Sequence, residues 1–187
     1  RSRFYGDMLV PGEGRYLQHT KVGGRESEEL VAAEIGSWMV QAMEKGVTYL
    51  IGPGSTTAAV MQEQGLPNTL LGVDVIRDGE LLASDADESM LFGCLQSCDR
   101  AHIVVTAIGG QGHVFGRGNQ QFSPAVIRKV GLQNITVIAT KSKISALEGR
   151  ALLVDTNDAE LDSLLAGYYQ VITGYDDYIL YRVGSVL

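Results

Sequence analysis

Three apolar segments without polar alternation mark the predicted centre of a sheet. They span residues 47–51, 103–107 and 135–140, and each leads through a turn or loop into a segment with helical spacing of its apolar residues. Strands that are apolar on both sides are typical of a parallel sheet with helices over both faces. The pattern therefore predicts an α/β fold with a largely parallel sheet flanked by helices.

The helices and hairpins follow from the remaining periodicity. The clearest helix is predicted over 27–45, with Ser27 as its N-cap. Asp78-Gly79 predicts a tight hairpin turn. The end, "YYQVITGYDDYILYRV", predicts an antiparallel hairpin at the edge of the sheet, turning between Gly174 and Asp177. Shorter helices are predicted over 56–64, 87–98 and 157–165, and within "SPAVIRKVG" and "KISALEG".

Length and composition limit the kind of protein. The 187 residues suit a single domain, with 1–22 as an extended arm or hairpin and 23–187 as the α/β core. The net charge of −7 argues against nucleic acid as a partner. No apolar run approaches the roughly 20 residues that span a membrane. With only two cysteines, a reducing cytoplasm is expected. The sequence begins without Met, which we interpret as a C-terminal fragment of a longer protein.

The segment "GPGSTT" predicts an anion-binding loop. It follows an apolar strand and opens a helix, whose first N–H groups lack partners and attract anions. Three hydroxyl residues exceed what one helix cap needs, although a glycine turn with an ordinary cap remains the alternative. No lysine lies between Lys45 and Lys129, so the loop lacks the lysine of a Walker P-loop. The candidate residues are Gly52, Gly54, Ser55, Thr56 and Thr57.

A second candidate segment is the glycine-rich loop "TAIGGQGHVFGRGNQQFS". Long loops at the carboxyl end of a strand are more often functional than idle. Arg117 suits a phosphate and Asn119 suits a base or ribose, while Gly110 and Gly112 would border the ligand. A mobile surface loop is the alternative. The Rossmann fingerprint G-x-G-x-x-G is absent.

Two further features carry candidate chemistry. Asp74 lies in an apolar stretch and needs a partner there, which predicts contact with a ribose hydroxyl or a metal, or else a structural ion pair. Cys94, Cys98 and His102 recur at intervals of four, as metal ligands on one helix would. The helix is expected to end before His102, so buried free thiols and no metal site are predicted.

The candidate loops should meet at one end of the sheet. Ligands of open α/β sheets bind beyond the carboxyl ends of the strands. "GPGSTT", "TAIGGQGHVFGRGNQQ" and "TKSK" each follow one of the three apolar strands. We therefore expect these three segments to converge on a single site.

The chain resembles the C-terminal part of the ATP–NAD kinase-like family, in particular its AcoX-type branch. The resemblance runs from about Lys21 to Val183. It is carried by "YLIGPGSTTAAVMQEQGLPNTLLGVDVIRDGEL", by "IVVTAIGGQGHVFGRGNQQFSPAVIRKVG" and by "LLVDTNDAELDSLLAGYYQVITGY". Of the wider family's Gly-Ser-Thr-Ala-Tyr motif only the first three residues match, because Thr57 and Ala58 replace the last two. The wider family's C-terminal domain is mainly β, whereas the local pattern here predicts α/β.

The resemblance implies phosphoryl transfer from ATP or polyphosphate to the 2′-hydroxyl of NAD, giving NADP, with Mg²⁺. The loop residues named above would then hold the nucleotide. The family's catalytic aspartate lies in a Gly-Gly-Asp-Gly-Thr motif that this sequence lacks. Catalytic residues are thus expected upstream, in a missing N-terminal domain, and the fragment alone is expected to be inactive. An exposed apolar face on helix 27–45 would indicate a homodimer or that missing domain.

Two other interpretations stay open at this point. Sugar-phosphate isomerases and transferase-type α/β proteins also have Gly-Ser/Thr-rich phosphate loops that run into a helix. A non-catalytic regulatory domain could bind a nucleotide without turning it over. The sequence does not separate either from the kinase interpretation.

Overall fold

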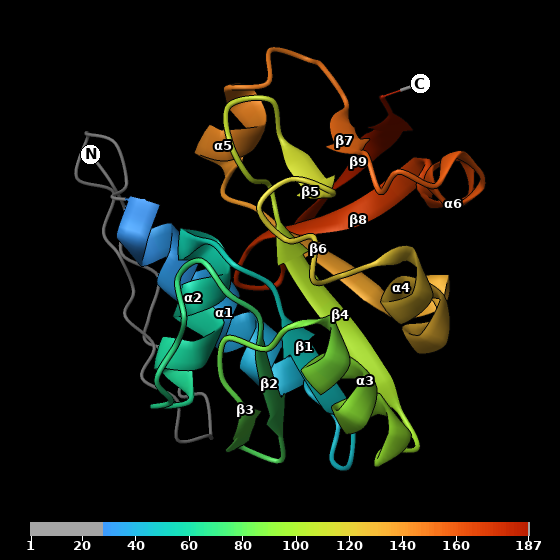
Figure 1. The fold of residues 1–187 in the computed structure, drawn as a ribbon. Coiled ribbons are helices and arrows are strands. Elements are labelled where there is room, and N and C mark those ends of the chain that lie inside the picture. Colours follow the sequence, from blue (N-terminus) through green and yellow to red (C-terminus); the bar gives the residue numbers. More distant parts are fainter. Residues whose placement is uncertain (1–27, 187) are drawn as a thin grey trace, which may run out of the picture.

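A computed structural model of the chain describes residues 28–186. The predicted arm at 1–22 and the predicted N-cap Ser27 lie outside the described residues. Within the described range, nine strands form one sheet in the order β3-β2-β1-β4-β6-β8-β9-β7-β5 (Figure 1). The strands are β1 Thr48–Ile51, β2 Asp74–Arg77, β3 Glu80–Ala83, β4 Ala101–Thr106, β5 His113–Phe115, β6 Ile135–Ile138, β7 Leu152–Val154, β8 Gly167–Gly174 and β9 Asp177–Ser185.

The three predicted apolar strands are neighbours in the sheet. They are β1, β4 and β6, and they pair in parallel. The chain turns at Asp78-Gly79 between β2 and β3, which pair antiparallel as predicted. The predicted α/β class with a mostly parallel sheet is confirmed.

The C-terminal hairpin of β8 and β9 is antiparallel, as predicted. It meets β6, the edge of the first five strands, at the single register pair Ile138↔Ile172. The sheet does not end there, because β7 pairs with β9 and β5 pairs with β7. Strand β5 lies inside the segment expected to be a loop. Its three residues are too few to show a strand period among the surrounding glycines.

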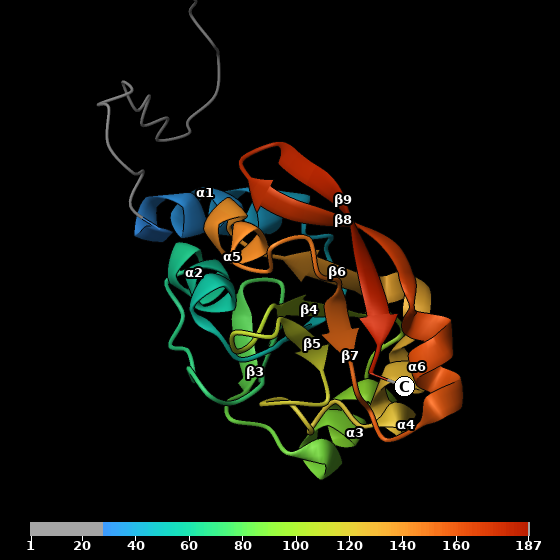
Figure 2. The same ribbon diagram turned by 90° about the horizontal axis from the view of Figure 1, so that it is seen from above.

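The helices cover both faces of the sheet, which is why its central strands are mainly apolar and largely buried. Ile35 of α1 and Val60 of α2 belong to one apolar cluster, while Leu91 of α3 and Ile127 of α4 belong to another. Figure 1 and Figure 2 show these two helix pairs on opposite sides of the sheet. The helices are α1 Glu28–Ala42, α2 Ser55–Glu63, α3 Glu88–Gln96, α4 Pro124–Val130, α5 Lys141–Ser145 and α6 Ala159–Leu165, with a 3-10 turn at Leu132–Asn134.

Local capping chemistry sets several of the helix starts. The Asp87 side chain accepts a hydrogen bond from Met90 N, and the Ser123 side chain accepts one from Val126 N ahead of Pro124. The sequence predicts Ser123 as an N-cap, whereas it leaves Asp85 and Asp87 as alternatives for α3, and the structure has Asp87 in that role. In the part of the chain that the structure describes, no helix has the length and apolar character needed to cross a membrane.

Candidate functional site

The turn after β1 is held tightly against β4. Gly52 N donates to Val104 O at 2.8 Å, and Gly54 N donates to Leu70 O at 3.1 Å. Gly54 has a φ of +134°, and a Cβ on it would lie 2.5 Å from Thr106 Cγ2. A side chain at this position would both strain the backbone and collide with β4. The glycine therefore lets the turn lie directly at the carboxyl end of the parallel strands.

The three hydroxyls of the loop do different things. Thr57 is buried, and its Oγ1 donates to Gly54 O at 2.9 Å, which closes the turn from within. The hydroxyls of Ser55 and Thr56 instead face a lysine from a distant part of the chain. Lys143 Nζ donates to Ser55 Oγ at 3.2 Å and to Thr56 Oγ1 at 3.0 Å. The loop thus gains the cation that its own sequence lacks.

Lys143 lies in the first turn of α5, directly after β6. Thr140 caps this helix by accepting a hydrogen bond from Lys143 N at 3.3 Å. Of residues 28–186, no carboxylate lies within salt-bridge distance of the ammonium group. Burial lowers the pKa of Lys143, an effect that the charge of Glu28 opposes. A half-buried cation with two hydroxyl partners favours an anion beside it.

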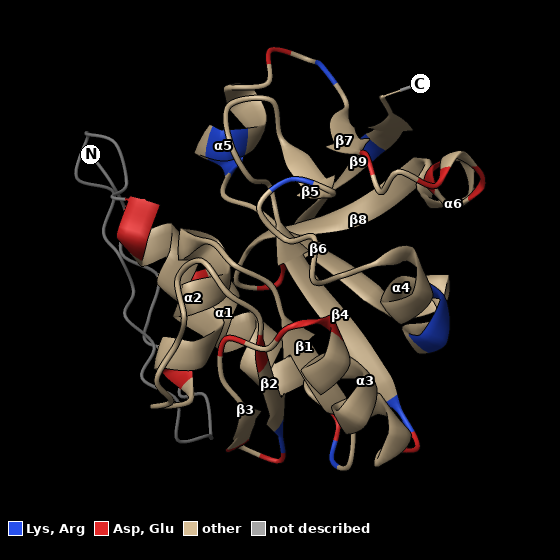
Figure 3. Cartoon of the chain, in the orientation of Figure 1, with Lys and Arg blue, Asp and Glu red and all other residues tan. Residues whose placement is uncertain are grey.

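Glu28 ties the start of α1 to the start of α5. Its carboxylate accepts a hydrogen bond from Thr140 Oγ1 at 2.7 Å and from Ser142 Oγ at 2.8 Å. These hydrogen bonds, with a smaller effect of Lys143, hold the pKa of Glu28 below its ordinary value. Figure 3 shows the acidic first turn of α1 and the basic α5 in this upper part of the molecule. Glu28 is therefore an anion at neutral pH.

The glycine-rich segment after β4 also reaches this end of the sheet. A Cβ on Gly52 would lie 3.1 Å from Phe122 Cε2, so the end of the segment packs on the "GPGSTT" turn. The three segments predicted to converge therefore do so. Their shared position after parallel strands is the sequence feature that predicted this convergence. No feature of the neighbouring sequence indicated that Lys143 would contact the hydroxyls of Ser55 and Thr56.

The polar residues of this segment have unlike surroundings. Asn119 is fully buried: its Nδ2 donates to Val114 O at 2.9 Å, and its Oδ1 accepts from Gly116 N at 3.1 Å. A Cβ on Gly112 would lie 2.7 Å from Leu147 Cδ2, so this glycine packs against the chain after α5. Gly110 and Arg117 are exposed. Of the four predicted ligand residues in this segment, these two have the open surroundings that a ligand contact needs.

Asp74 lies at the same end of the sheet, opposite Ile51 of β1. Its carboxylate is 2% exposed and accepts hydrogen bonds from Thr69 N at 2.6 Å, Thr69 Oγ1 at 2.8 Å, Ser84 Oγ at 3.3 Å and Asp85 N at 3.1 Å. These bonds join the two chain segments that flank β2 and β3. Within residues 28–186 the group has no ion-pair partner, and the hydrogen bonds fill that structural role.

Replacing Asp74 by asparagine is expected to destabilise the fold by about 2–4 kcal/mol. The side-chain amide replaces one carboxylate oxygen, an acceptor, by an NH2 group, and this donor would face the N–H and O–H donors that now bond to Asp74. Urea unfolding measures this change, and Asp176→Asn in the exposed turn between β8 and β9 is the matched control. A variant of unchanged stability that loses nucleotide affinity would instead show that Asp74 binds the ligand.

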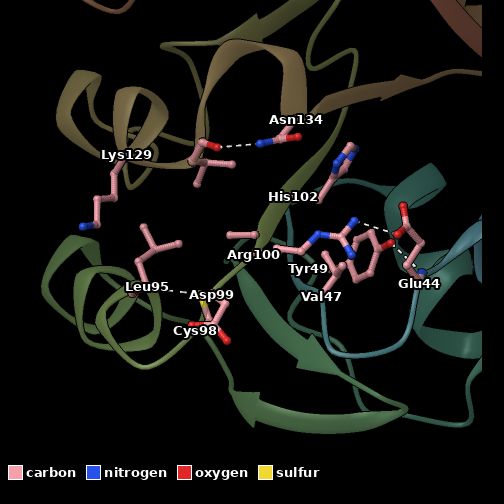
Figure 4. Close-up of a pocket in the computed structure, with 12 residues that line it drawn as sticks. Glu44, Val47, Tyr49, Leu95, Cys98, Asp99, Arg100, His102, Lys129 and Asn134 are labelled. Atoms are coloured by element: carbon pink, nitrogen blue, oxygen red, sulfur yellow. Dashed lines mark hydrogen bonds and ion pairs between the residues drawn. The ribbon is translucent and has the colours of Figure 1, made fainter.

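A separate pocket of about 390 Å³ lies at the opposite end of the parallel strands (Figure 4). Two of its charged groups are paired with each other: Arg100 and Glu44 form a salt bridge at 2.6 Å. His102 Nε2 lies 2.7 Å from Thr136 Oγ1, and burial lowers the pKa of His102. This pocket is remote from Lys143 and from the converging loops, so we place the candidate functional site at the carboxyl ends of the strands.

The cysteines beside this pocket are free thiols. Helix α3 ends at Gln96, before His102, as the sequence predicted, and His102 lies in β4. Cys94 in α3 and Cys98 just after it are partly rather than fully buried, and both pack against the edge of the apolar cluster under α3 and α4. Among residues 28–186 no group of His, Cys, Asp and Glu side chains is arranged to hold a metal ion.

Comparison with known proteins identifies the family. The family model of the ATP-NAD kinase C-terminal domain matches residues 44–183. The match includes the "GPGSTT" turn, the glycine-rich segment and Lys143. Neither a curated protein nor a solved structure gives a significant match. Because the family model matches about three quarters of the chain, the protein belongs to the ATP-NAD kinase C-terminal domain family.

Proposed function

We propose that this chain is the nucleotide-binding part of an NAD kinase-like phosphotransferase of the AcoX-type branch. In that reaction, ATP or polyphosphate supplies a phosphoryl group to the 2′-hydroxyl of NAD. The observation that carries the proposal is the meeting of Lys143 with Ser55 and Thr56 at the start of α2. A helix N-terminus, two hydroxyls and an ammonium group together form a site for a phosphate.

The chemistry of phosphoryl transfer suits such a site. The enzyme mainly has to position the donor and acceptor and to neutralise the charge on the transferred group. Gly52 and Gly54 bring the backbone close to a phosphate, and Lys143 supplies the positive charge. Arg117 and Gly110 would border the nucleotide from the neighbouring segment. Gly112, Asn119 and Thr57 would shape the site through the backbone that they hold.

The proposal assigns binding and positioning to this chain. The catalytic aspartate of the family lies in a Gly-Gly-Asp-Gly-Thr motif, which the printed sequence lacks. We propose that a partner domain supplies that residue. Mg²⁺, when bound with ATP, would neutralise the donor phosphates. Since the described residues contain no group arranged to hold a metal, we assign no Mg²⁺ ligand to this chain.

Calorimetric titration of ATP and NAD tests the proposed site. We expect the combined change Ser55→Ala and Thr56→Val to weaken nucleotide binding about tenfold or more, because two hydrogen bonds to an anion are lost. Ser163→Ala on the exposed face of α6 is the control. If the double variant binds both nucleotides as tightly as the parent protein, the loop is a turn and the proposed function fails.

A further inference from the structure

The β8–β9 hairpin has two unlike faces. The side chains of its inner face belong to the apolar core or pack against it: Tyr169, Val171, Ile179, Tyr181 and Val183. The hydroxyl of Tyr169 also donates to Leu165 O of α6 at 2.9 Å. Successive side chains of a strand point to opposite faces, so the residues between these point outward. Figure 2 shows the hairpin along one side of the molecule.

The outer face of the hairpin is largely apolar, although water reaches it. Tyr168, Tyr178 and Leu180 are 69%, 54% and 66% exposed. Antiparallel strands with one side in water usually carry polar residues on that side. A group of exposed apolar side chains on a folded domain marks an interaction surface.

Helix α1 offers no comparable surface. Its apolar residues Ile35 and Met39 are buried in the core. Glu28, Glu34 and Gln41 are among its exposed residues. The exposed apolar face that would indicate a homodimer therefore lies on the hairpin rather than on this helix.

Opposite charges lie at the two ends of the outer face. Arg182 is paired with Tyr168 across the strands, and Asp176 lies in the hairpin turn, just before β9. Both are exposed, and within residues 28–186 neither forms a salt bridge. Along β9 the outer row thus reads Asp176, Tyr178, Leu180, Arg182. This order of acid, two apolar residues and base is complementary to itself when it is reversed.

We propose that the outer face of the hairpin binds a second copy of the chain, about a two-fold axis that reverses the strand direction. The axis passes at Ile179, midway between Asp176 and Arg182. Each Tyr178 then lies opposite the partner's Leu180, and each Arg182 lies opposite the partner's Asp176. Self-complementary surfaces of this kind are typical of two-fold dimers. The inference does not depend on the proposed nucleotide site.

The charge of the chain favours both this face and this orientation. Two copies that each carry a net charge of −7 repel each other. The outer row has no acidic residue between its ends, so the copies can approach there with less repulsion. A parallel arrangement would place Arg182 against the partner's Arg182, whereas the reversed one pairs opposite charges.

Sedimentation velocity of the full chain at several concentrations tests the dimer. We expect a species of twice the mass of one chain. Leu180→Lys should weaken the dimer about tenfold or more, because it places a charge against the partner's Tyr178. Leu180 is exposed, so this variant should keep the circular dichroism of the parent chain. Leu71→Lys, at an exposed leucine before β2, is the control and should leave the dimer unchanged.

An exchange of charges tests the orientation. Arg182→Asp alone and Asp176→Lys alone should each weaken the dimer about fivefold or more, because like charges then meet. The two changes together restore opposite charges and should recover most of the affinity. A double variant that dimerises no better than the single variants would overturn the two-fold arrangement.

Two further results would overturn the proposal. A parent chain that stays monomeric up to about 100 μM has no self-association through this face. If Leu180→Lys then lowers the unfolding midpoint of that monomer, another segment of the same chain covers the face instead. A dimer that Leu180→Lys leaves intact forms through a different surface.

Discussion

Replacing Gly116 by alanine is expected to remove at least about 3 kcal/mol of folding free energy, a large part of the stability of a domain. A Cβ on Gly116 would lie 1.7 Å from the carbonyl oxygen of Asp155, which belongs to the backbone and cannot rotate away. The residue also has a φ of +96°, a conformation that alanine adopts at a cost. To accept the methyl group, the chain would have to separate β5 from β7.

Denaturant unfolding of the purified variant measures this loss. Gly110→Ala is the matched control from the same segment, because no atom lies within 4 Å of its added Cβ and its φ is not in the left-handed region. The control should stay within about 0.5 kcal/mol of the parent protein. Equal unfolding midpoints for the Gly116 and Gly110 variants would contradict the close packing of β5 on β7.

Replacing Lys143 by methionine is expected to weaken pyrophosphate and nucleotide binding by about 10- to 100-fold. This loss of affinity corresponds to the removal of a hydrogen bond to a charged group, which contributes about 1.5–3 kcal/mol to binding. Methionine keeps much of the length and the apolar contacts of lysine, so the change removes mainly the charge. Arginine at this position should restore part of the affinity. Lys129→Met, on α4 beside the pocket at the opposite end of the strands, is the control.

The dependence of binding on pH gives a second measurement for Lys143. The ammonium form binds the anion, and burial lowers its pKa from the ordinary lysine value. Binding is therefore complete well below the folded pKa and declines as the pH rises through it. The parent chain should lose pyrophosphate affinity on the alkaline side, and Lys143→Met should lack this decline. The same alkaline decline in both proteins would assign the titration to another group.

The local pattern predicted much of the fold correctly. The apolar strands at β1, β4 and β6, the hairpin turns and the Ser123 cap all depend on neighbouring residues. Burial on both faces requires continuous apolar residues, and a helix start requires a side-chain acceptor for its first N–H groups. Both requirements can be read from a short stretch of chain. The meeting of three loops followed from one general property of parallel sheets.

What the sequence failed to predict depends on distant pairing. Strand β5 forms because its three residues pair with β7, and β7 in turn pairs with β9. The sequence predicted only that Asp74 needs a partner, and the groups that bond to it lie before β2 and after β3. Asn119 likewise turns inward to bond the backbone of its own segment. In each case the partner's position is set by the order and register of the strands.

The sequence by itself determined the α/β class, the glycine turn at the end of β1 and a loop with more hydroxyls than a helix cap needs. Only the tertiary structure decided which cation lies beside the hydroxyls of that loop. Lys143 is 88 residues from Ser55 along the chain, and it reaches Ser55 because β1 and β6 both flank β4. Parallel neighbours bring their carboxyl ends to one edge, so a site can be assembled from residues with no local relation to one another.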